Sequence, residues 1–206
     1  MRALREPFRI IRANLRAYLV MNVILYVLFF LGMGAALLFP ELNAASIGSM
    51  EEDGTADLVG TLLGNAWLFG LTIFAVNVLT VALLTILLPS MIVPFAGLVL
   101  FTYRAFEFGV TLAPVDAITA KILIPHSLTI LIEFQAYALV MLAAYVLGKA
   151  WLRPESVGAG NRRQGYVRGL RLVGWLSLPA LALFVVGAIY EAIEIIYLVP
   201  PLVLPG

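Results

Sequence analysis

The fold of this chain is decided by residues 18–39, which read YLVMNVILYVLFFLGMGAALLF. This run contains no charged residue, and a helix needs about 20 consecutive apolar residues to cross a bilayer. The apolar region of a signal peptide is shorter, at about 7–15 residues, and Pro40-Glu41 after the run does not resemble a cleavage site. We therefore predict a retained membrane-spanning helix.

The apolar character of this run extends over the whole chain. Its 206 residues are 63% hydrophobic and 12% charged, whereas soluble domains carry about 25% charged residues. This composition excludes a cytosolic enzyme, a secreted domain and a disordered chain. The sequence contains no cysteine, which excludes disulfides and thiolate metal sites.

Four more apolar runs predict four more spans, and the expected fold is an all-α, polytopic transmembrane bundle with five spans in a single membrane domain. The four runs are residues 62–88, 91–112, 128–148 and 173–199. Ser127 is the expected N-cap of the fourth span. Residues 40–61 are acidic and rich in glycine, so we expect a loop. Residues 113–126 could be either a loop or a short interfacial helix.

The segment before the first span predicts an amphipathic helix over residues 3–17. Its basic residues fall on one helical stripe, and an apolar stripe lies on another face. The basic stripe is Arg5, Arg9, Arg12 and Arg16, and the apolar stripe is Phe8, Ile11, Leu15 and Tyr18. Such a helix can lie on an anionic membrane surface. The alternative is a simple juxtamembrane charge anchor.

The distribution of basic residues predicts the orientation. Eleven of the 13 basic residues lie in residues 2–16 and 149–171, and the positive-inside rule places such segments in the cytoplasm. This agrees with five spans, a cytoplasmic N-terminus and the inner membrane of a prokaryote; a six-span chain would return its C-terminus to the cytoplasm. Residues 149–172 are then a basic cytoplasmic loop, which could also bind a cytoplasmic partner or anionic lipid.

Charged residues inside the predicted spans are the candidate functional residues. They are Arg104, Glu107, Glu133, Glu191 and Glu194. A rise of about 1.5 Å per residue places all five at one depth, in the outer half of the bilayer. Intramembrane charges usually face a bundle interior or a wet cavity, so we expect one polar layer. We also expect at least one of its glutamates to be protonated at neutral pH, because desolvation and like charges favour the neutral form.

Three further polar residues belong to the expected site. His126 and Tyr137 share a helical stripe with Glu133, and Asn77 lies in the middle of the second span, where an amide joins helices more often than it binds a ligand. Three interpretations of the layer stay open. They are a structural polar network, a proton or cation pathway, and a metal site formed by His126 with two carboxylates. The Gly60-x-x-x-Gly64 motif of helix packing lies at the outer edge of this second span.

No catalytic motif supports an enzyme. The sequence lacks GxSxG, HExxH and GxxxxGK[ST], which are typical of hydrolases, zinc proteases and ATP-binding loops. We therefore predict a protein that is not an enzyme and has no cofactor and no bound metal. Its expected partners are the lipid bilayer and a membrane protein or a second copy of the chain, but no nucleic acid.

Four segments resemble those of the stage II sporulation protein M family of integral membrane proteins. The segment 73–84, with Asn77, is similar to the family's phenylalanine-asparagine-asparagine segment, although Val76 replaces the first asparagine. Gly97 to Gly109 is similar to the glycine-leucine-asparagine-glycine helix, with Arg104-Ala105 at its asparagine-glycine pair.

The other two segments lie in the C-terminal half. Pro125-His126 matches the family's proline-histidine pair, with Glu133 as its downstream glutamate, and residues 189–199 resemble the acidic last helix. The resemblance implies a multi-span helical protein; in spore formers, members belong to a peptidoglycan-remodelling engulfment complex. It marks His126, Glu133 and either Glu191 or Glu194.

These observations together predict a non-enzymatic membrane subunit, either a scaffold or a permease-like component of a larger complex. The alternative is a transporter or channel for protons, cations or a small solute. A scaffold would tolerate Glu133→Gln, whereas a transporter would lose flux with the same change.

Overall fold

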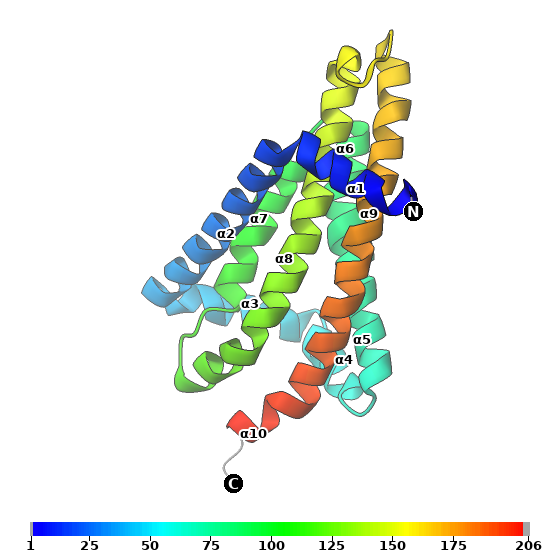
Figure 1. The fold of residues 1–206 in the computed structure, drawn as a ribbon. Coiled ribbons are helices and arrows are strands. Elements are labelled where there is room, and N and C mark those ends of the chain that lie inside the picture. Colours follow the sequence, from blue (N-terminus) through cyan, green and yellow to red (C-terminus); the bar gives the residue numbers. More distant parts are fainter. Residues whose placement is uncertain (1, 204–206) are drawn as a thin grey trace.

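The computed structural model of the protein describes residues 2–203, and the side chains of residues 5–203. Every regular element in this part of the chain is helical, and the long helices lie side by side in a bundle (Figure 1). The protein is therefore an all-helical protein, as the sequence predicts.

Within residues 2–203, four helical stretches are long and apolar enough to cross a membrane. The first is α2 (Leu15–Leu38). The second, Ala66–Ile92, is continuous through α5 (Ala66–Ala75), the π-helix η1 (Val76–Leu87) and α6 (Leu88–Ile92). The third is α8 (Ala117–Leu152), and the fourth joins α9 (Arg162–Ile193) to the π-helix η3 (Glu194–Leu198). A short helix, α10 (Pro200–Val203), follows.

The remaining predicted span, residues 91–112, contains the shorter helix α7 (Ala96–Thr111). Its 16 residues extend about 24 Å, less than the roughly 30 Å of a bilayer core. Figure 1 shows α7 lying along α2. Asn43 donates hydrogen bonds to the carbonyl oxygens of Val110 (2.9 Å) and Thr111 (3.0 Å), so it satisfies the end of α7. A fifth span stays a prediction.

The loop predicted for residues 40–61 is wrong, because most of this segment is helical. It forms α3 (Pro40–Glu52) and α4 (Thr55–Leu62), separated at Asp53-Gly54. Pro40 is the first residue of α3, a position where its missing N–H costs no hydrogen bond. Gly54 has φ +78°, a left-handed conformation that favours glycine.

The helix start predicted at Ser127 is also wrong, because α8 begins at Ala117. Residues 117–126, left open between loop and interfacial helix, are the first turns of α8. Asp116 is the actual N-cap: its Oδ1 accepts hydrogen bonds from the backbone N–H groups of Ile118 and Thr119, both at 2.8 Å. Pro125 lies inside α8, where it removes one intrahelical hydrogen bond.

We expect the Asp116 cap to weaken in acid. Hydrogen bonds from the backbone and the hydroxyl of Thr119 hold the pKa of the Asp116 carboxyl below its usual value. The ionised cap therefore stabilises the helix above the unfolded-state pKa of about 3.9, and this contribution is lost as pH falls through the lower folded-state value. Amide protection factors at Ile118 and Thr119 should fall on acidification. Asp116→Asn, which still caps but does not titrate, should show no such fall, and an equal fall would contradict the assignment.

Residues 149–172 form a helical hairpin, which corrects the basic loop predicted for this segment. The helix α8 continues to Leu152 and α9 already begins at Arg162, so only residues 153–161 connect them, with the 3₁₀ turn η2 (Pro154–Val157). Gly158 has φ +67°, and Asn161 caps α9 by accepting a hydrogen bond from the Gln164 N–H at 3.0 Å. Figure 1 shows this hairpin at one end of the bundle.

The N-terminal helix α1 (Arg2–Ala13) lies across that end of the bundle, against α9 (Figure 1). Its boundary and its inward face differ from the prediction. Asn14 separates α1 from α2, so Arg16 belongs to α2. Ile10 is buried and packs with Ile11 on the core, whereas Phe8 is 64% exposed. The four basic residues of the predicted stripe are all exposed.

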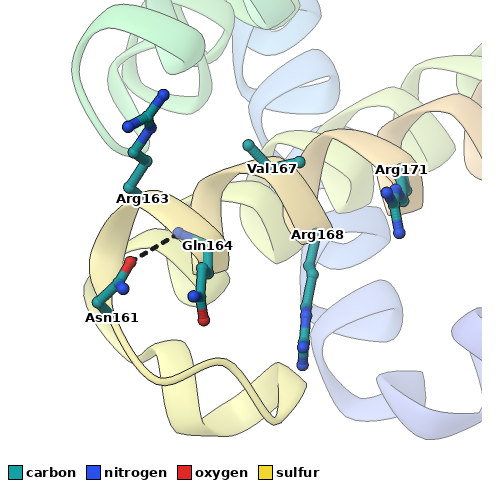
Figure 2. Close-up of a pocket in the computed structure, with 6 residues that line it drawn as sticks. All are labelled: Asn161, Arg163, Gln164, Val167, Arg168 and Arg171. Carbon is teal, nitrogen blue, oxygen red and sulfur yellow. Dashed lines mark hydrogen bonds between the residues drawn. The ribbon is translucent and has the colours of Figure 1, made fainter.

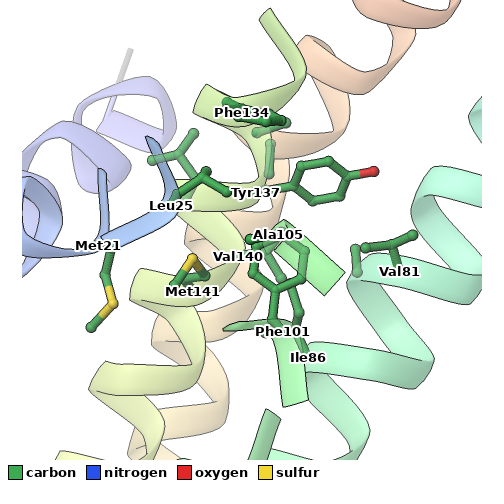
Figure 3. Packing of buried hydrophobic residues seen from close by; sticks show 14 of the residues in the cluster. Met21, Leu25, Val81, Ile86, Phe101, Ala105, Phe134, Tyr137, Val140 and Met141 are labelled. Atoms are coloured by element: carbon green, nitrogen blue, oxygen red, sulfur yellow. The ribbon is translucent and has the colours of Figure 1, made fainter. Parts of the chain in front are cut away.

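The core is built around α8. In its most apolar part 72% of the residues are buried, against 28% in α2 and 22% in Ala66–Ile92. Figure 3 shows Tyr137 of α8 among buried apolar side chains from neighbouring helices. The ring of Tyr137 packs on those of Phe101 and Phe184, with centroid distances of 5.2 and 5.1 Å. The helix α8 is therefore the central element of the bundle.

Glycine permits a close approach between α2 and α7. A Cβ atom on Gly32 of α2 would overlap the carbonyl oxygen of Phe106 on α7, and one on Gly109 of α7 would overlap the carbonyl oxygen of Phe29 on α2. The two backbones therefore touch where the side chain is a hydrogen atom, as in close-packed membrane helices.

Candidate functional site

The candidate site is a set of polar residues that join α8 to its neighbours, which we name the α8 cluster. Its members are Asn77, His126, Thr129, Glu133, Tyr137, Glu191 and Glu194. Four of them lie on α8 at spacings of three or four residues, so they share one face of that helix. Asn77 comes from η1, and the last two glutamates come from the end of α9 and the start of η3.

The first half of the α8 cluster surrounds Glu194, whose side chain is fully buried. Its Oε2 accepts a hydrogen bond from the Thr129 hydroxyl at 2.6 Å, and its Oε1 lies 3.0 Å from His126 Nδ1. The His126 side chain is 13% exposed. This contact joins α8 to η3.

The second half is a hydrogen-bonded chain between η1 and α8. The Tyr137 hydroxyl donates to Asn77 Oδ1 at 2.8 Å, and Asn77 Nδ2 donates to Glu133 Oε1. Glu133 also lies against α9, because a Cβ atom built on Gly187 would be 3.0 Å from Glu133 Cγ. Three helical segments therefore meet at one amide and one carboxyl group.

Glu191 belongs to both halves, because Glu133 and His126 are both among its neighbours. Next to it in sequence, the Tyr190 hydroxyl donates to the carbonyl oxygen of Pro125 at 3.1 Å. This bond attaches α9 to the part of α8 that proline interrupts.

Both partner helices of α8 are π-helical at the α8 cluster. Asn77 is the second residue of η1, and Glu194 is the first residue of η3. The side chain of Thr85 follows the wider turn, since its hydroxyl donates to the Thr80 carbonyl oxygen five residues earlier. A π-helical turn rotates the residues that follow it, and such turns are frequent at functional sites.

Arg104 and Glu107 lie apart from the α8 cluster, although the depth argument predicts one layer. They form an ion pair of 2.7 Å within α7, and their side chains are 41% and 32% exposed. The Arg104 guanidinium stacks over the Phe108 ring at 5.5 Å. Phe108 in turn stacks on Tyr137 with a centroid distance of 6.0 Å, so this aromatic contact joins α7 to the α8 cluster.

Thr129 and Gln135 are among the interior polar residues that the sequence analysis missed. Thr129 lies three residues after His126 on the same helical stripe, which was the available signal. Gln135 accepts a hydrogen bond from the Tyr18 hydroxyl at 2.7 Å and donates one to Asn22 Oδ1 at 2.9 Å. Tyr18 and Asn22 are four residues apart on one face of α2, and this spacing was readable in the first span.

The polar groups of the interior are fully paired. Within residues 5–203, no buried side-chain nitrogen or oxygen atom lacks a hydrogen-bond partner. In the same part of the chain, no three His, Asp or Glu side chains converge as metal ligands. The arrangement is therefore a satisfied interhelical network with titratable groups in it, and its geometry does not favour the metal interpretation.

Comparison of the chain with protein-family models, with curated proteins and with solved structures finds no match.

Proposed function

We propose that the protein is a non-enzymatic integral membrane subunit, a scaffold or permease-like component of a larger membrane complex. The observation that supports this most is the use of the polar groups on α8. They bond to η1 and to η3, and no buried polar side chain of the described residues is left free. Such a network fixes helix register, with each bond contributing about 0.6–2 kcal/mol in a membrane.

The partner surfaces in this proposal are the outer faces of the bundle. Large apolar side chains are exposed on α2 and α5, among them Phe30 (59%), Leu31 (58%) and Trp67 (82%). Lipid covers such faces in a bilayer, and a membrane protein or a second copy of the chain is the further partner we propose.

The direct test of the scaffold is Glu133→Gln. The amide oxygen of glutamine can still accept the hydrogen bond from Asn77, so we expect a loss of stability below about 1 kcal/mol and an unchanged set of cross-linked partners after purification. In liposomes, the variant and the wild-type chain should show the same ion flux. A variant that keeps its partners but loses pH-dependent flux would contradict the scaffold.

A second candidate function is a proton or cation pathway, which one specific contact favours. His126 and Glu194 lie 3.0 Å apart, and the His126 side chain is 13% exposed whereas that of Glu194 is fully buried, so the imidazole can connect the carboxyl to water. Protonatable chains of this kind are typical of proton relays in membrane proteins. The liposome flux measured with Glu133→Gln separates this function from the scaffold.

We also propose kinship with the stage II sporulation protein M family, residence in the inner membrane of a prokaryote, and five spans with a cytoplasmic N-terminus. The bonds between His126 and Glu194 and between Asn77 and Glu133 support the kinship, because they involve the residues that the resemblance marks. A reporter fused to the C-terminus tests the topology. Five spans place the C-terminus outside the cytoplasm, so a reporter that is active only in the cytoplasm should be inactive there.

A further inference from the structure

A basic cleft lies at the end of the bundle where α1 crosses α9, and it contains no residue of the α8 cluster. It has a volume of about 520 Å³ and is lined by α1, the C-terminal turns of α8, the 153–161 connection and α9. Its basic residues come from three different helices. They are Arg9, Lys149, Arg168 and Arg171.

The charge of this cleft is largely uncompensated. Its one acidic lining residue, Glu6, forms an ion pair with Arg9. Among the described side chains, neither Lys149, Arg168 nor Arg171 takes part in an ion pair. Four basic residues against one acidic residue leave a charge of about +3, which favours an anion.

Two of the cations are held in place by neutral acceptors. Arg168 Nη1 donates to the carbonyl oxygen of Val157 at 2.8 Å, and Lys149 Nζ donates to Asn14 Oδ1 at 3.5 Å. Figure 2 shows a neighbouring pocket on α9, which Arg168 and Arg171 line together with Arg163. The guanidinium groups keep further N–H donors for a ligand, and phosphate matches that donor geometry.

The other wall of the cleft is apolar. Ile10 and Val146 are buried, and Leu172 and Trp175 are half-buried one and two turns along α9 from Arg168. An anion that is only polar would leave this wall against water, whereas an amphiphile covers it. The volume falls within the range of about 300–1,000 Å³ for small-molecule sites.

We propose that this cleft binds the phosphate headgroup of an anionic phospholipid, with an acyl chain lying along Leu172 and Trp175. The helix α1 forms one wall through Arg9 and Ile10, so the bound lipid joins α1 to the α8–α9 hairpin. The proposal does not depend on the scaffold or transport function, because none of its residues belongs to the α8 cluster.

The test uses the full chain in phosphatidylcholine vesicles with brominated lipid as a quencher of Trp175. Trp67→Phe and Trp151→Phe leave Trp175 as the single tryptophan of the three in the sequence. A basic residue near an anionic lipid surface contributes about 1 kcal/mol, which is roughly fivefold in binding. We expect brominated phosphatidylglycerol to bind at least fivefold more tightly than brominated phosphatidylcholine.

The decisive variant is Arg168→Gln with Arg171→Gln, which should remove most of this preference. The matched control is Arg153→Gln with Arg162→Gln, which removes the same charge from the same hairpin at exposed residues outside the cleft and its neighbouring pocket and should keep the preference. Arg171→Gln alone, which breaks no described hydrogen bond, should lower the preference about fivefold with an unchanged helical circular dichroism spectrum.

Three outcomes would overturn the proposal. One is equal quenching by the two brominated lipids in the wild-type chain. Another is an equal loss of preference in the two double variants, which would indicate general surface charge. The last is complete displacement of brominated phosphatidylglycerol by excess inorganic phosphate, which would assign the cleft to a soluble phosphate compound.

Discussion

Glu194→Leu is expected to lower the free energy of unfolding in detergent by about 1–3 kcal/mol, because it leaves polar groups unpaired inside the bundle. Leucine fills a similar volume but offers no acceptor, so the Thr129 hydroxyl and His126 Nδ1 both lose their partner. Thr129 is 1% exposed, and water therefore does not replace the lost bond. Denaturant titration followed by circular dichroism measures the change.

Two variants serve as controls for this result. Glu194→Gln keeps one oxygen acceptor at the same position and should cost less than the leucine variant. Arg162→Leu removes a charge from the exposed first turn of α9 and should change stability by less than about 0.5 kcal/mol. Equal losses for Glu194→Leu and Arg162→Leu would show that the α8 cluster does not hold the helices together.

Gly32→Val is expected to prevent the normal packing of α2 on α7, with a loss of about 3 kcal/mol or more. The new Cβ would overlap the Phe106 carbonyl oxygen, and a backbone atom cannot move aside as a side chain can. The helices must therefore separate, which also removes the contact at Gly109. Thermal unfolding and the yield of folded protein after gel filtration measure the effect.

The matched control lies two residues further along α2. A Cβ atom on Gly34 would meet no atom within 4 Å, so Gly34→Ala should be neutral or slightly stabilising, since alanine favours the helix by about 1 kcal/mol. Gly32→Ala should already be destabilising. Similar behaviour of the two alanine variants would contradict the close approach of the backbones.

The long apolar helices could be predicted from the sequence because hydropathy and length decide whether a helix can cross a bilayer. Their ends could not, because capping depends on single hydrogen bonds. Ser127 follows Pro125 and looked like an N-cap, yet the carboxyl of Asp116 caps α8 eleven residues before it. The glycines of the acidic segment 40–61 predicted a loop, but its other residues form helices.

Only part of the candidate site could be predicted, because the sequence gives the depth of a side chain but not its direction. A rise of about 1.5 Å per residue gives the depth of a side chain in a span, but it does not give the direction in which that side chain points. Depth placed Arg104 and Glu133 at one level, whereas α7 packs mainly on α2 and Arg104 forms its ion pair with Glu107 of the same helix. The π-helical turns at Asn77 and Glu194 rotate the side chains that follow them. No residue spacing in the sequence predicts these turns.

Glycine contacts show the same limit. The motif Gly60-x-x-x-Gly64 is recognisable in sequence, but a Cβ atom on either glycine would meet no atom within 4 Å. Gly32 and Gly109 belong to no such motif with each other, because they lie on different helices. Close approach is a property of a pair of helices, and a single helix sequence does not contain it.

The central position of α8 has a consequence for the order of synthesis. Asn77 leaves the ribosome 56 residues before Glu133, and at about 5–20 residues per second the interval is roughly 3–11 s. The interval is longer for Asn22, because its partner Gln135 follows 113 residues later. During that time the early helices carry amides without their final partners, so the nascent chain must keep them near water or the insertion machinery until α8 arrives.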